Sequence, residues 1–534
     1  MKSRPVVFMT FKEYDNLGIG YMAALLSEKG FATKVIDINK KKASILKTLK
    51  QTDPLLVGFS VVFQYYIDQF IDLISFLRRE GINYHFTAGG HYASLKYDEL
   101  FEYIPFLDSI VRFEGEYTIL ELAGCIQRGE NWKRIDGLVY KNKSKIVTNA
   151  IRPFEKNLDK FPFPLRSPLR TYAFELKFAT MIAGRGCLNN CAFCNAKKFY
   201  NQKQGFTKRI RKPEMVVEEM SMLYQKKGCS IFLFLDDDFP VKSTIEPEWV
   251  KQFCDELDRT GLTGKILWKI NCRPDEVDEE SFRLMKRHGL FLIFLGIEDG
   301  TDSGLKRMKK NMTVDSSLKA VSILKKLEIG FDYGFMLFQP STNYASLNEN
   351  LDFLKQICND GFATVTFNKM MPYYETRIEK ELVKEGRLKV MAGIRDYDFL
   401  NETMDQYYDF TTDCFREWLR NRDGLTNTSN WAGSYISVYL NYFKFTPEGI
   451  KFIRKIRKII SRCNLYILET MKEIAVIFES NQSGYIINEL LDSYRENIKT
   501  KHEYFRKEII DTMADFISQV EDQQIRAYLD SYNR

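Results

Sequence analysis

Short apolar runs alternate with amphipathic stretches at the start of the chain. Continuous runs predict strands at residues 6–9, 33–38, 55–62, 84–88 and 109–113. Apolar residues that recur every three or four positions predict helices at residues 19–29, 66–79 and 118–126. Strands that alternate with helices form a doubly wound parallel sheet. The pattern therefore predicts a Rossmann-like α/β domain over residues 1–135.

A proline-rich connector is predicted over residues 136–175. Its first part is compatible with a hairpin that turns at Asn142-Lys143. Pro162, Pro164 and Pro168 follow closely on one another, and they exclude a long helix because proline lacks the amide hydrogen. The segment is therefore expected to be an extended linker or strap between two domains.

A second series of strands and helices is predicted over residues 176–390. The expected strands lie at residues 178–183, 231–235, 266–271, 291–296, 331–338 and 363–368. The expected helices lie at residues 213–226, 247–259, 279–288, 314–327 and 346–359. This alternation is typical of a partial (β/α)6 barrel of the TIM type, which binds ligands at the carboxyl ends of its strands.

The pattern becomes purely helical beyond about residue 400, and an all-α domain is predicted over residues 391–534. Thr446 and Pro447 are suited to start a helix, because threonine caps the first turn and proline is tolerated at its first position. One face of this helix is apolar; its residues are Ile450, Ile453, Ile456, Ile459 and Ile460. The basic side chains opposite form either a solvated face or a docking face for an acidic substrate or partner.

Composition indicates a globular protein with no strong bias toward one class of partner. The chain has 534 residues, 45% hydrophobic and 28% charged, and a net charge of +7. No dense basic stripe accompanies this charge, so we expect no nucleic-acid binding. No apolar run is long enough for a signal peptide or a bilayer span. We therefore expect a soluble, cytoplasmic protein that does not bind membranes.

The cysteines carry the clearest chemical signal. Three of the 10 cysteines are crowded as Cys187-x3-Cys191-x2-Cys194, directly after the first strand of the second series. Thiolates in a short loop bind iron–sulfur clusters, Cu(I) or zinc. Structural zinc takes four protein ligands, and no histidine or second cysteine pair lies nearby in the sequence. In a four-iron cluster, three cysteines leave one iron open to a small molecule.

This cysteine spacing resembles that of the radical SAM superfamily, and Phe193 matches the aromatic residue before the third cysteine. The resemblance implies a [4Fe-4S] cluster held by Cys187, Cys191 and Cys194, with Phe193 in the site for S-adenosyl-L-methionine (SAM). A single electron then cleaves SAM to a 5′-deoxyadenosyl radical, while the protein orients the cofactor and excludes water. A structural cluster in a redox-sensing or scaffold protein is the alternative.

Further segments resemble the SAM-binding motifs of this superfamily. Asp237 and Asp236, after the second barrel strand, would accept hydrogen bonds from the methionine ammonium, or else be helix caps or surface charges. Arg273 would pair with the methionine carboxylate, or with a neighbouring acid as a structural salt bridge. Gly296 would allow close approach, and Glu298 would bind polar groups near the nucleoside.

Two segments depart from the superfamily pattern. Residues 334–342 lack the glycines and the acid that are common after the fifth strand, and Glu375 stands where glycine is frequent. The departures concern the adenine and substrate sides of the expected pocket and leave the cysteine motif unaffected.

The first domain admits two interpretations. Gly18, Gly20 and Ala23 fit the G-x-G-x-x-A fingerprint of a dinucleotide-binding domain, and Asp37 follows as the acid. That fingerprint needs its first glycine directly after the strand, whereas Gly18 lies nine residues beyond the apolar run. The order of motifs instead resembles the amino-terminal domain of cobalamin-dependent radical SAM enzymes, and this resemblance extends over residues 5–390.

The second resemblance implies a corrinoid without an axial histidine. The loop after the first strand contains no histidine, and Phe63, Gln64 or Tyr65 would meet the lower face of the cobalt. His91 is expected to be a pocket or turn residue rather than a cobalt ligand. Glycines at strand ends let the backbone approach the flat corrin closely. The other residues expected in the cobalamin site are Gly18, Ser60, Gly89, Gly90, Glu114 and Gly115.

The two resemblances together imply a cobalamin-dependent radical SAM methyltransferase of the class B type. Such an enzyme uses the 5′-deoxyadenosyl radical and methylcobalamin to methylate an unactivated carbon, here of a peptide or a small natural-product intermediate. A flavodoxin- or ferredoxin-type electron donor is also implied. No residue is assigned as a general acid or base. An enzyme of the same architecture that performs a radical rearrangement, cyclisation or oxidation is the alternative.

Overall fold

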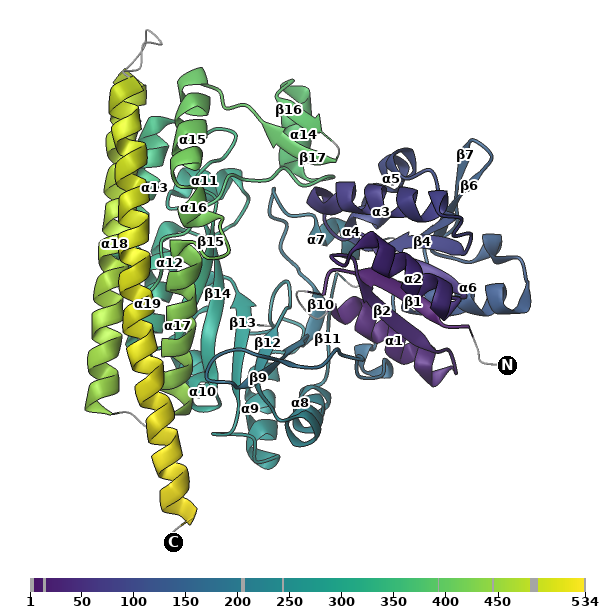
Figure 1. The fold of residues 1–534 in the computed structure, drawn as a ribbon, viewed down its shortest axis with the longest axis horizontal. Coiled ribbons are helices and arrows are strands. Elements are labelled where there is room, and N and C mark those ends of the chain that lie inside the picture. The colour runs from purple at the N-terminus through teal and green to yellow at the C-terminus, as the bar shows by residue number, and fades with distance from the viewer. Residues whose placement is uncertain are drawn as a thin grey trace. The chain divides into compact units, whose positions relative to one another are not determined.

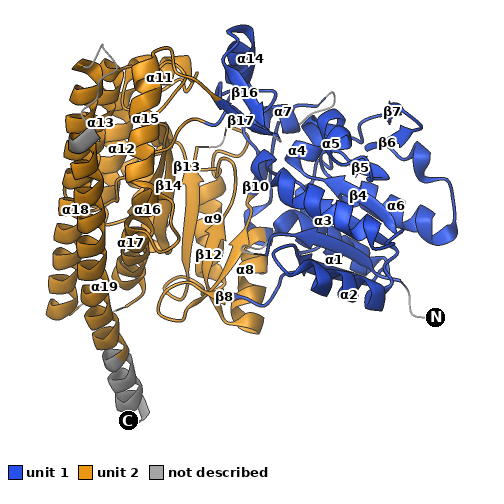
Figure 2. Ribbon diagram, turned by 45° about the horizontal axis from the view of Figure 1, so that its top comes forward, with its two compact units in different colours: residues 1–169, 184–215, 371–396 blue, residues 170–183, 216–370, 397–534 orange. Residues whose placement is uncertain are grey.

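The chain folds into two compact units, each assembled from separate parts of the sequence (Figure 1, Figure 2). Unit 1 comprises residues 1–169, 184–215 and 371–396, and unit 2 comprises residues 170–183, 216–370 and 397–534. The computed structural model describes residues 4–12, 16–202, 207–242, 244–391, 393–443, 446–480 and 488–532, without the side chains of residues 488, 489 and 522–532. Each unit therefore contains segments that are far apart in the sequence.

Unit 1 contains a seven-stranded sheet with the order β2-β1-β3-β4-β5-β6-β7. The strands are β1 (Val6–Thr10), β2 (Thr33–Asp37), β3 (Leu56–Ser60), β4 (His85–Gly89), β5 (Ser109–Val111), β6 (Leu138–Asn142) and β7 (Lys145–Thr148). β1 to β5 are parallel, which confirms the doubly wound sheet, and the predicted hairpin adds β6 and β7 in antiparallel pairing. The strand order reverses beside β1, so β1 and β3 border the switch point where such sheets bind ligands.

Helices cover both faces of this sheet. They are α1 (Leu17–Glu28), α2 (Lys42–Thr52), α3 (Ile67–Arg79), α4 (His91–Leu95), α5 (Tyr97–Tyr103) and α6 (Glu116–Arg128). α1 and α6 lie side by side and bury Ile19 and Leu122, whereas α2 and α3 bury Leu49 and Phe70 in a second cluster. The sequence pattern predicts no helix at α2, because only Ile45 and Leu49 of its residues are buried.

Two further segments of the chain complete unit 1. The first contains β10 (Gly184–Gly186), α7 (Ala196–Tyr200) and β11 (Lys208–Ile210). The second contains α14 (Arg377–Lys384), β16 (Leu388–Met391) and the start of β17 (Ile394–Tyr397). The cysteine motif therefore belongs to the same compact unit as the amino-terminal sheet.

Unit 2 contains a six-stranded sheet with the order β15-β14-β13-β12-β9-β8. The strands are β8 (Arg170–Thr171), β9 (Lys177–Met181), β12 (Cys229–Phe234), β13 (Leu267–Cys272), β14 (Leu290–Glu298) and β15 (Gly330–Phe335). β9 and β12 to β15 are parallel and confirm the first five predicted barrel strands, whereas β8 is a short antiparallel edge.

The sixth predicted barrel strand, at residues 363–368, is wrong. No strand forms there, and the pairing with the chain after β15 is limited to an isolated bridge between Phe338 and Lys369 at the end of the segment. Side chains occupy the backbone amides that a strand would need for pairing. Val365 N donates to Asn464 Oδ1 at 2.9 Å, and Thr366 N donates to the Tyr333 hydroxyl at 3.3 Å. Only its end pairs through the backbone: Asn368 N donates to the carbonyl of Phe335 at 2.9 Å and its carbonyl accepts from Phe338 N at 3.3 Å.

Helices surround the sheet of unit 2. They are α8 (Pro213–Lys227), α9 (Trp249–Arg259), α10 (Glu279–Arg287), α11 (Asp302–Arg307), α12 (Val314–Lys326), α13 (Tyr344–Cys358), α15 (Glu402–Cys414), α16 (Arg416–Leu419), α17 (Leu425–Tyr442), α18 (Pro447–Ser480) and α19 (Asn488–Tyr532). Helices were expected at α8, α9, α10, α12 and α13, whereas the short α11 was not. Within the described part of the chain, no helix combines the length and apolarity needed to cross a bilayer.

The C-terminal helices pack against the strands and helices of the partial barrel within unit 2. α17 lies against β13, β14 and β15, and α18 lies against α13 and α19 (Figure 1). α18 begins as predicted, since Gly449 N donates to Thr446 Oγ1 at 3.1 Å. Ile453, Ile456 and Ile460 are buried, which confirms the apolar face of this helix.

Candidate functional site

The three clustered cysteines lie in one loop of unit 1, between β10 and α7. β10 pairs with β11 in an antiparallel ribbon that anchors the start of the loop. Gly186 has φ +86°, and a Cβ there would collide with the carbonyl of Thr207, so only glycine fits this entry to the loop. Cys187 and Cys191 are half-buried, and Cys194 is exposed.

Nitrogen donors lie beside the cysteine sulfurs. Asn189 Nδ2 donates to Cys187 Sγ at 3.5 Å, and Ala196 N donates to Cys194 Sγ at 3.5 Å. The amide of Cys194 also donates to the carbonyl of Cys191 at 3.2 Å, which closes a turn. Such donors favour the thiolate over the thiol, and hydrogen bonds to sulfur tune the reduction potential of iron–sulfur clusters.

This donor set fits a cluster better than a single metal ion. Among the residues that the structure describes, no three His, Cys, Asp or Glu side chains converge on one point, as a single ion requires. In a cluster each thiolate binds a different iron atom, so the sulfurs need not converge. Three soft thiolates in a loop with N–H donors are therefore suited to a cluster with one iron left open.

Buried ion pairs connect the cysteine loop to the end of β5. Arg185 of β10 donates to Glu116 Oε1 at 2.6 Å and lies 3.4 Å from Glu114 Oε1, and Arg209 of β11 donates to Glu114 Oε2 at 3.0 Å. All four side chains are at most 10% exposed. Burial opposes the ionisation of Glu114, yet the two guanidinium groups hold its pKa below the ordinary value. Glu114, expected in the cobalamin site, is thus engaged in anchoring the loop.

His91 packs against the helix that follows the cysteine loop. Its imidazole is stacked on the ring of Phe199, with centroids 3.9 Å apart, and Phe199 also contacts Phe113 at 5.4 Å. Burial lowers the pKa of His91 to about 4, so the ring is neutral near pH 7. Gly90 precedes it with φ +110°, and a Cβ there would lie 2.8 Å from the carbonyl of Val61. The pocket or turn role of His91 stays a prediction of the sequence.

Gln64 in unit 1 has a polar side-chain group that suits a bound ligand. Its side chain is fully buried, and neither its amide nitrogen nor its amide oxygen has a hydrogen-bond partner among the described residues. A buried amide without partners costs about 1–3 kcal/mol. Next to it, Phe63 is 42% exposed and stacked on Tyr65 at 5.2 Å. A flat, partly polar group such as a corrin would supply both a partner for the amide and cover for the ring.

The other residues expected to bind cobalamin lie at the carboxyl edge of the sheet. Ser60 ends β3 at the switch point, and its hydroxyl accepts from Asn16 Nδ2 at 3.1 Å. Gly18 lies in the first turn of α1, Gly89 ends β4, and Gly115 precedes α6. The fold thus brings these positions to one edge of the sheet. Residues 13–15 of the histidine-free loop lie outside the described residues.

The segment around Glu375, one of the two departures from the superfamily pattern, approaches the cysteine loop within unit 1. Burial, and after it the charge of Cys194, raises the pKa of Tyr373. The hydroxyl of Tyr374 donates to the carbonyl of Val62 at 3.3 Å, next to Phe63. Glu375 has φ +61°, a conformation that favours glycine, and this explains why glycine is frequent at this position of the family pattern. The segment therefore borders both the cysteine loop and the cobalamin edge.

In unit 2, the two acidic candidates after β12 differ in environment. Both carboxylate oxygens of Asp236 accept from the amide of Ala183, at 3.1 and 3.0 Å, and the side chain is buried. Asn271 Nδ2 donates to the carbonyl of Asp236 at 3.0 Å. Asp237 is exposed. Asp236 therefore holds the end of β9, and Asp237 is accessible to a ligand.

Arg273 is held by the protein itself. Its guanidinium donates to both carboxylate oxygens of Asp275 at 2.9 Å and to the carbonyl of Lys310 at 2.6 Å. This arrangement is a structural salt bridge, which is one of the two alternatives that the sequence allows for Arg273. The planar guanidinium suits such a bidentate pair and fixes the turn after β13.

Gly296 and Glu298 lie beside a lysine that the sequence reasoning missed. Lys310 Nζ is 3.4 Å from Glu298 Oε1, and a Cβ on Gly296 would lie 2.7 Å from the same ammonium. Glu298 ends β14 with φ +73°, next to a shift in register with β15. The only sequence signal for this contact is the basic run 309–310, which is an ordinary surface pattern. Phe193, the remaining candidate for SAM, is half-buried in the cysteine loop of unit 1.

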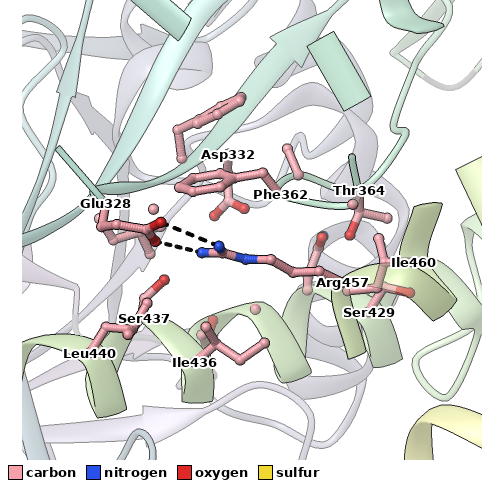
Figure 3. A pocket seen from close by; sticks show the side chains of 18 residues that line it. Glu328, Asp332, Phe362, Thr364, Ser429, Ile436, Ser437, Leu440, Arg457 and Ile460 are labelled. Carbon is pink, nitrogen blue, oxygen red and sulfur yellow. Dashed lines mark hydrogen bonds and ion pairs between the residues drawn. The ribbon is translucent and has the colours of Figure 1, made fainter. Parts of the chain in front are cut away.

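A small cavity of about 30 Å³ lies in unit 2, away from these motifs (Figure 3). Asp332 of β15 faces it, together with Ser429 of α17, and Arg457 of α18 pairs there with Glu328 at 2.7 Å. Burial raises the pKa of Asp332, and Lys269 partly offsets this effect. None of the candidate residues lines this cavity, so we do not assign it to the site.

Comparisons with known proteins identify two families that match separate segments of the chain. The radical SAM superfamily model matches residues 181–354, and the B12 binding domain model matches residues 4–123. An uncharacterized methyltransferase of Pyrococcus horikoshii is 26% identical over 430 residues, which is 79% of this chain and 87% of that protein. The hopanoid C-3 methylase of Methylococcus capsulatus is 25% identical over 332 residues, or 60% of each chain.

A solved structure shares the fold over nearly the whole chain. The cobalamin-dependent SAM radical enzyme OxsB, with aqua-cobalamin bound, superimposes with a TM-score of 0.64 at 16% identity. The match covers 94% of this chain and 84% of that one. A B12-binding domain followed by a radical SAM domain, with a [4Fe-4S] cluster, SAM and cobalamin as cofactors, identifies the chain as a cobalamin-dependent radical SAM enzyme.

Proposed function

We propose that this enzyme transfers a methyl group to an unactivated carbon of a small-molecule or peptide substrate. The observation that carries the proposal is the cysteine loop, which belongs to the same compact unit as the B12-binding sheet. The names of the two relatives above, a methyltransferase and a methylase, support methylation over a rearrangement, cyclisation or oxidation. When bound, the cluster and SAM supply a carbon-centred radical and the corrinoid supplies a transferable methyl group.

Cys187, Cys191 and Cys194 would hold the cluster, and the protein tunes it through the donors at their sulfurs. The N–H groups of Asn189 and Ala196 stabilise negative charge on the thiolates. The ion pairs of Arg185 hold β10 in place, so the first cysteine enters from a rigid strand. A positioned loop costs less ordering on binding than a flexible one.

Gln64 would donate to or accept from the corrinoid, with Phe63 and Tyr65 covering its lower face. The imidazole of His91 is neutral, and its face is covered by the ring of Phe199. This packing supports a pocket role and not cobalt ligation. Ser60, Gly18, Gly89, Gly90 and Gly115 would border the ring at the carboxyl edge of the sheet. In this site Glu114 acts through the loop that it anchors.

At the strand ends of unit 2, Asp237, Glu298 and Gly296 are the residues that we propose for SAM. In unit 1, Phe193 of the cysteine loop keeps the SAM-binding role that the sequence resemblance implies. Asp236 and Arg273 would act as positioning residues, because Ala183 and Asp275 occupy their polar atoms. Charge-assisted hydrogen bonds from the methionine ammonium to carboxylates are stronger than neutral ones. This assignment needs no general base in the chain.

We further propose a location, partners and domain boundaries for this enzyme. They are a cytoplasmic location, an electron donor of the flavodoxin or ferredoxin type, no nucleic-acid partner, and domains over residues 1–135, 176–390 and 391–534 with a strap at 136–175. The sequence contains no dense basic stripe, which supports the expectation of no nucleic-acid partner.

Anaerobic turnover tests the proposal. The reconstituted protein, reduced with dithionite and supplied with SAM and cobalamin, should release 5′-deoxyadenosine and S-adenosylhomocysteine. Candidate substrates encoded beside the gene should gain the mass of one CH2 unit. Release of 5′-deoxyadenosine with a product of unchanged mass, or of lower mass, would replace methylation by a rearrangement or an oxidation. Iron binding without any 5′-deoxyadenosine would leave only a structural cluster.

A further inference from the structure

An exposed apolar patch lies on α14, β16 and β17 in unit 1. We define this α14 patch by four residues, which are Val383 (60% exposed), Val390 (48%), Met391 (78%) and Ile394 (37%). α14 lies beside β16 and β17 (Figure 2). Single exposed apolar residues are ordinary, whereas several within 12 positions of the chain are typical of a surface that binds another molecule.

Basic side chains surround the α14 patch. Those on α14, on β16 and in the turn between them are Arg377, Lys380, Lys384, Arg387 and Lys389. Three of them form ion pairs, Arg377 with Glu381, Lys380 with Glu375 and Arg387 with Glu385, and Asp396 is a further exposed acid. α7 adds Lys197 and Lys198. Although burial opposes it, the charges of Lys380, Lys96 and Lys198 help to keep the pKa of Glu375 below its ordinary value. Lysines of α7 and α14 thus face a common region, and the local charge is positive.

The α14 patch is connected directly to the cysteine loop. Ile378 N, in the first turn of α14, donates to the carbonyl of Ala192 at 3.2 Å. Ala192 lies between Cys191 and Cys194 in the sequence. α14 has 8 residues, so the helix is about 12 Å long. A molecule seated on the patch is therefore separated from the cysteine loop by one short helix.

We propose that the α14 patch is the docking surface for an acidic, one-electron donor protein of the flavodoxin or ferredoxin type. The inference rests on the proposed function, because reductive cleavage of SAM consumes one electron that no residue of the chain supplies. One electron leaves the reduced flavin or iron–sulfur centre of the donor and enters the cluster. The donor is oxidised as the cluster is reduced, and no bond forms or breaks in this step.

The charge pattern favours this occupant over a second copy of the chain. A donor with a negative surface gains attraction from the basic rim, which accelerates encounter and fixes orientation. Two copies would bring like charges together around the apolar centre, which costs affinity. The exposed side chain of Met391 is unbranched and polarizable, so it adapts to a partner surface.

Binding of oxidised flavodoxin to the full-length protein tests the proposal without turnover. The double variant Lys384→Glu, Lys389→Glu and the single variant Met391→Asp should each raise Kd by about tenfold at low ionic strength. The matched control is Lys47→Glu, Lys50→Glu on α2 of the same unit, where both lysines are exposed. This control should leave Kd within about twofold of wild type. Added salt should weaken wild-type binding and reduce the difference between the variants.

Single-turnover cleavage of SAM separates this inference from the proposed function. With flavodoxin as reductant the patch variants should be slower than wild type, and with dithionite all variants should be equal. Failure of dithionite to support cleavage in wild type would defeat the proposed function, while the binding data would still decide the docking surface. Unchanged Kd in all patch variants would overturn the proposal. The proposal would also be overturned if the patch mutations converted a dimer to a monomer without changing the binding of flavodoxin.

Discussion

The imidazole of His91 lies parallel to the ring of Phe199, with ring centroids 3.9 Å apart and an angle of 1° between the planes. His91 opens the helix after β4, and Phe199 belongs to the helix after the cysteine loop. The contact therefore joins the carboxyl edge of the B12-binding sheet to the segment that carries the three thiolates. Burial lowers the pKa of the imidazole to about 4, so the stacked ring is neutral near pH 7.

The stacked imidazole predicts a pH dependence of stability. Burial lowers the pKa of His91 in the folded protein to about 4, from 6.5. Between these values the unfolded chain binds the extra proton, so stability is fully present above pH 6.5 and decreases as the pH falls toward 4. His91→Phe keeps the stacking and removes the titration. Urea unfolding should show that wild type loses about 1–3 kcal/mol more than this variant between pH 7 and pH 4. Parallel pH curves would contradict this account.

The unpartnered amide of Gln64 predicts opposite effects on the apoprotein and on cobalamin binding. Gln64→Leu removes two buried polar atoms at nearly constant volume, so the apoprotein should gain about 1 kcal/mol, seen as a higher Tm. The same change should weaken cobalamin binding, measured by absorbance titration, because a hydrogen-bonding partner is lost. Gln69→Leu, on the exposed side of α3, is the matched control and should change neither quantity. A destabilised Gln64→Leu apoprotein would show that the amide is already satisfied.

The ion pairs beneath the cysteine loop predict a strong coupling between Arg185 and Glu116. Arg185→Met leaves the buried carboxylate of Glu116 without its guanidinium, and it should cost about 3–5 kcal/mol in urea unfolding. Adding Glu116→Leu removes the stranded charge and should restore most of that loss. Additive effects in this double-mutant cycle would be inconsistent with a direct pair.

The cysteine loop predicts which thiols carry the cluster. Cys191→Ala should abolish the brown chromophore and the cleavage of SAM, while the far-ultraviolet circular dichroism remains that of wild type. Cys414→Ala is the control, because Cys414 is half-buried like Cys191 but lies on α15. Full SAM cleavage in Cys191→Ala would exclude the assigned ligand set, as would loss of iron in Cys414→Ala.

The backbone of Glu375 predicts an unusual order of substitutions. At φ +61° a Cβ is strained, so Glu375→Gly should cost little even though it removes the 3.1 Å pair with Lys380. Glu375→Val places a branched side chain in the same conformation and should be less stable than Glu375→Gly by about 1–2 kcal/mol. Thermal unfolding measures both. If valine proved as stable as glycine, the strain at this position would be refuted.

Long periodic segments and motifs at strand ends could be predicted from the sequence. The parallel strands of both sheets were found because buried runs of five or six residues lie between turn signals, and α18 was found from its cap at Thr446. The cysteine motif was found because its spacing has few other uses.

Contacts between distant segments could not be predicted. Nothing in the sequence near residues 363–368 shows that Asn464 would occupy the backbone of the expected strand. Arg185 and Arg209 lie in a region whose charges look like an ordinary surface, yet their partners are about 70 and 95 residues away. The motif around Arg273 is compatible with a ligand of SAM or with a structural salt bridge. The salt bridge is seen only in the structure, where Arg273 pairs with Asp275.

Unit 1 is completed only when residues 371–396 have been added to a sheet that begins at residue 6. During synthesis on the ribosome, the nascent chain must therefore expose the cysteine loop for some 180 residues before its last neighbours emerge. Contacts of such long sequence separation form slowly. Insertion of iron and sulfide is thus expected to follow release of the chain, and a messenger truncated before codon 371 would yield thiols open to oxidation.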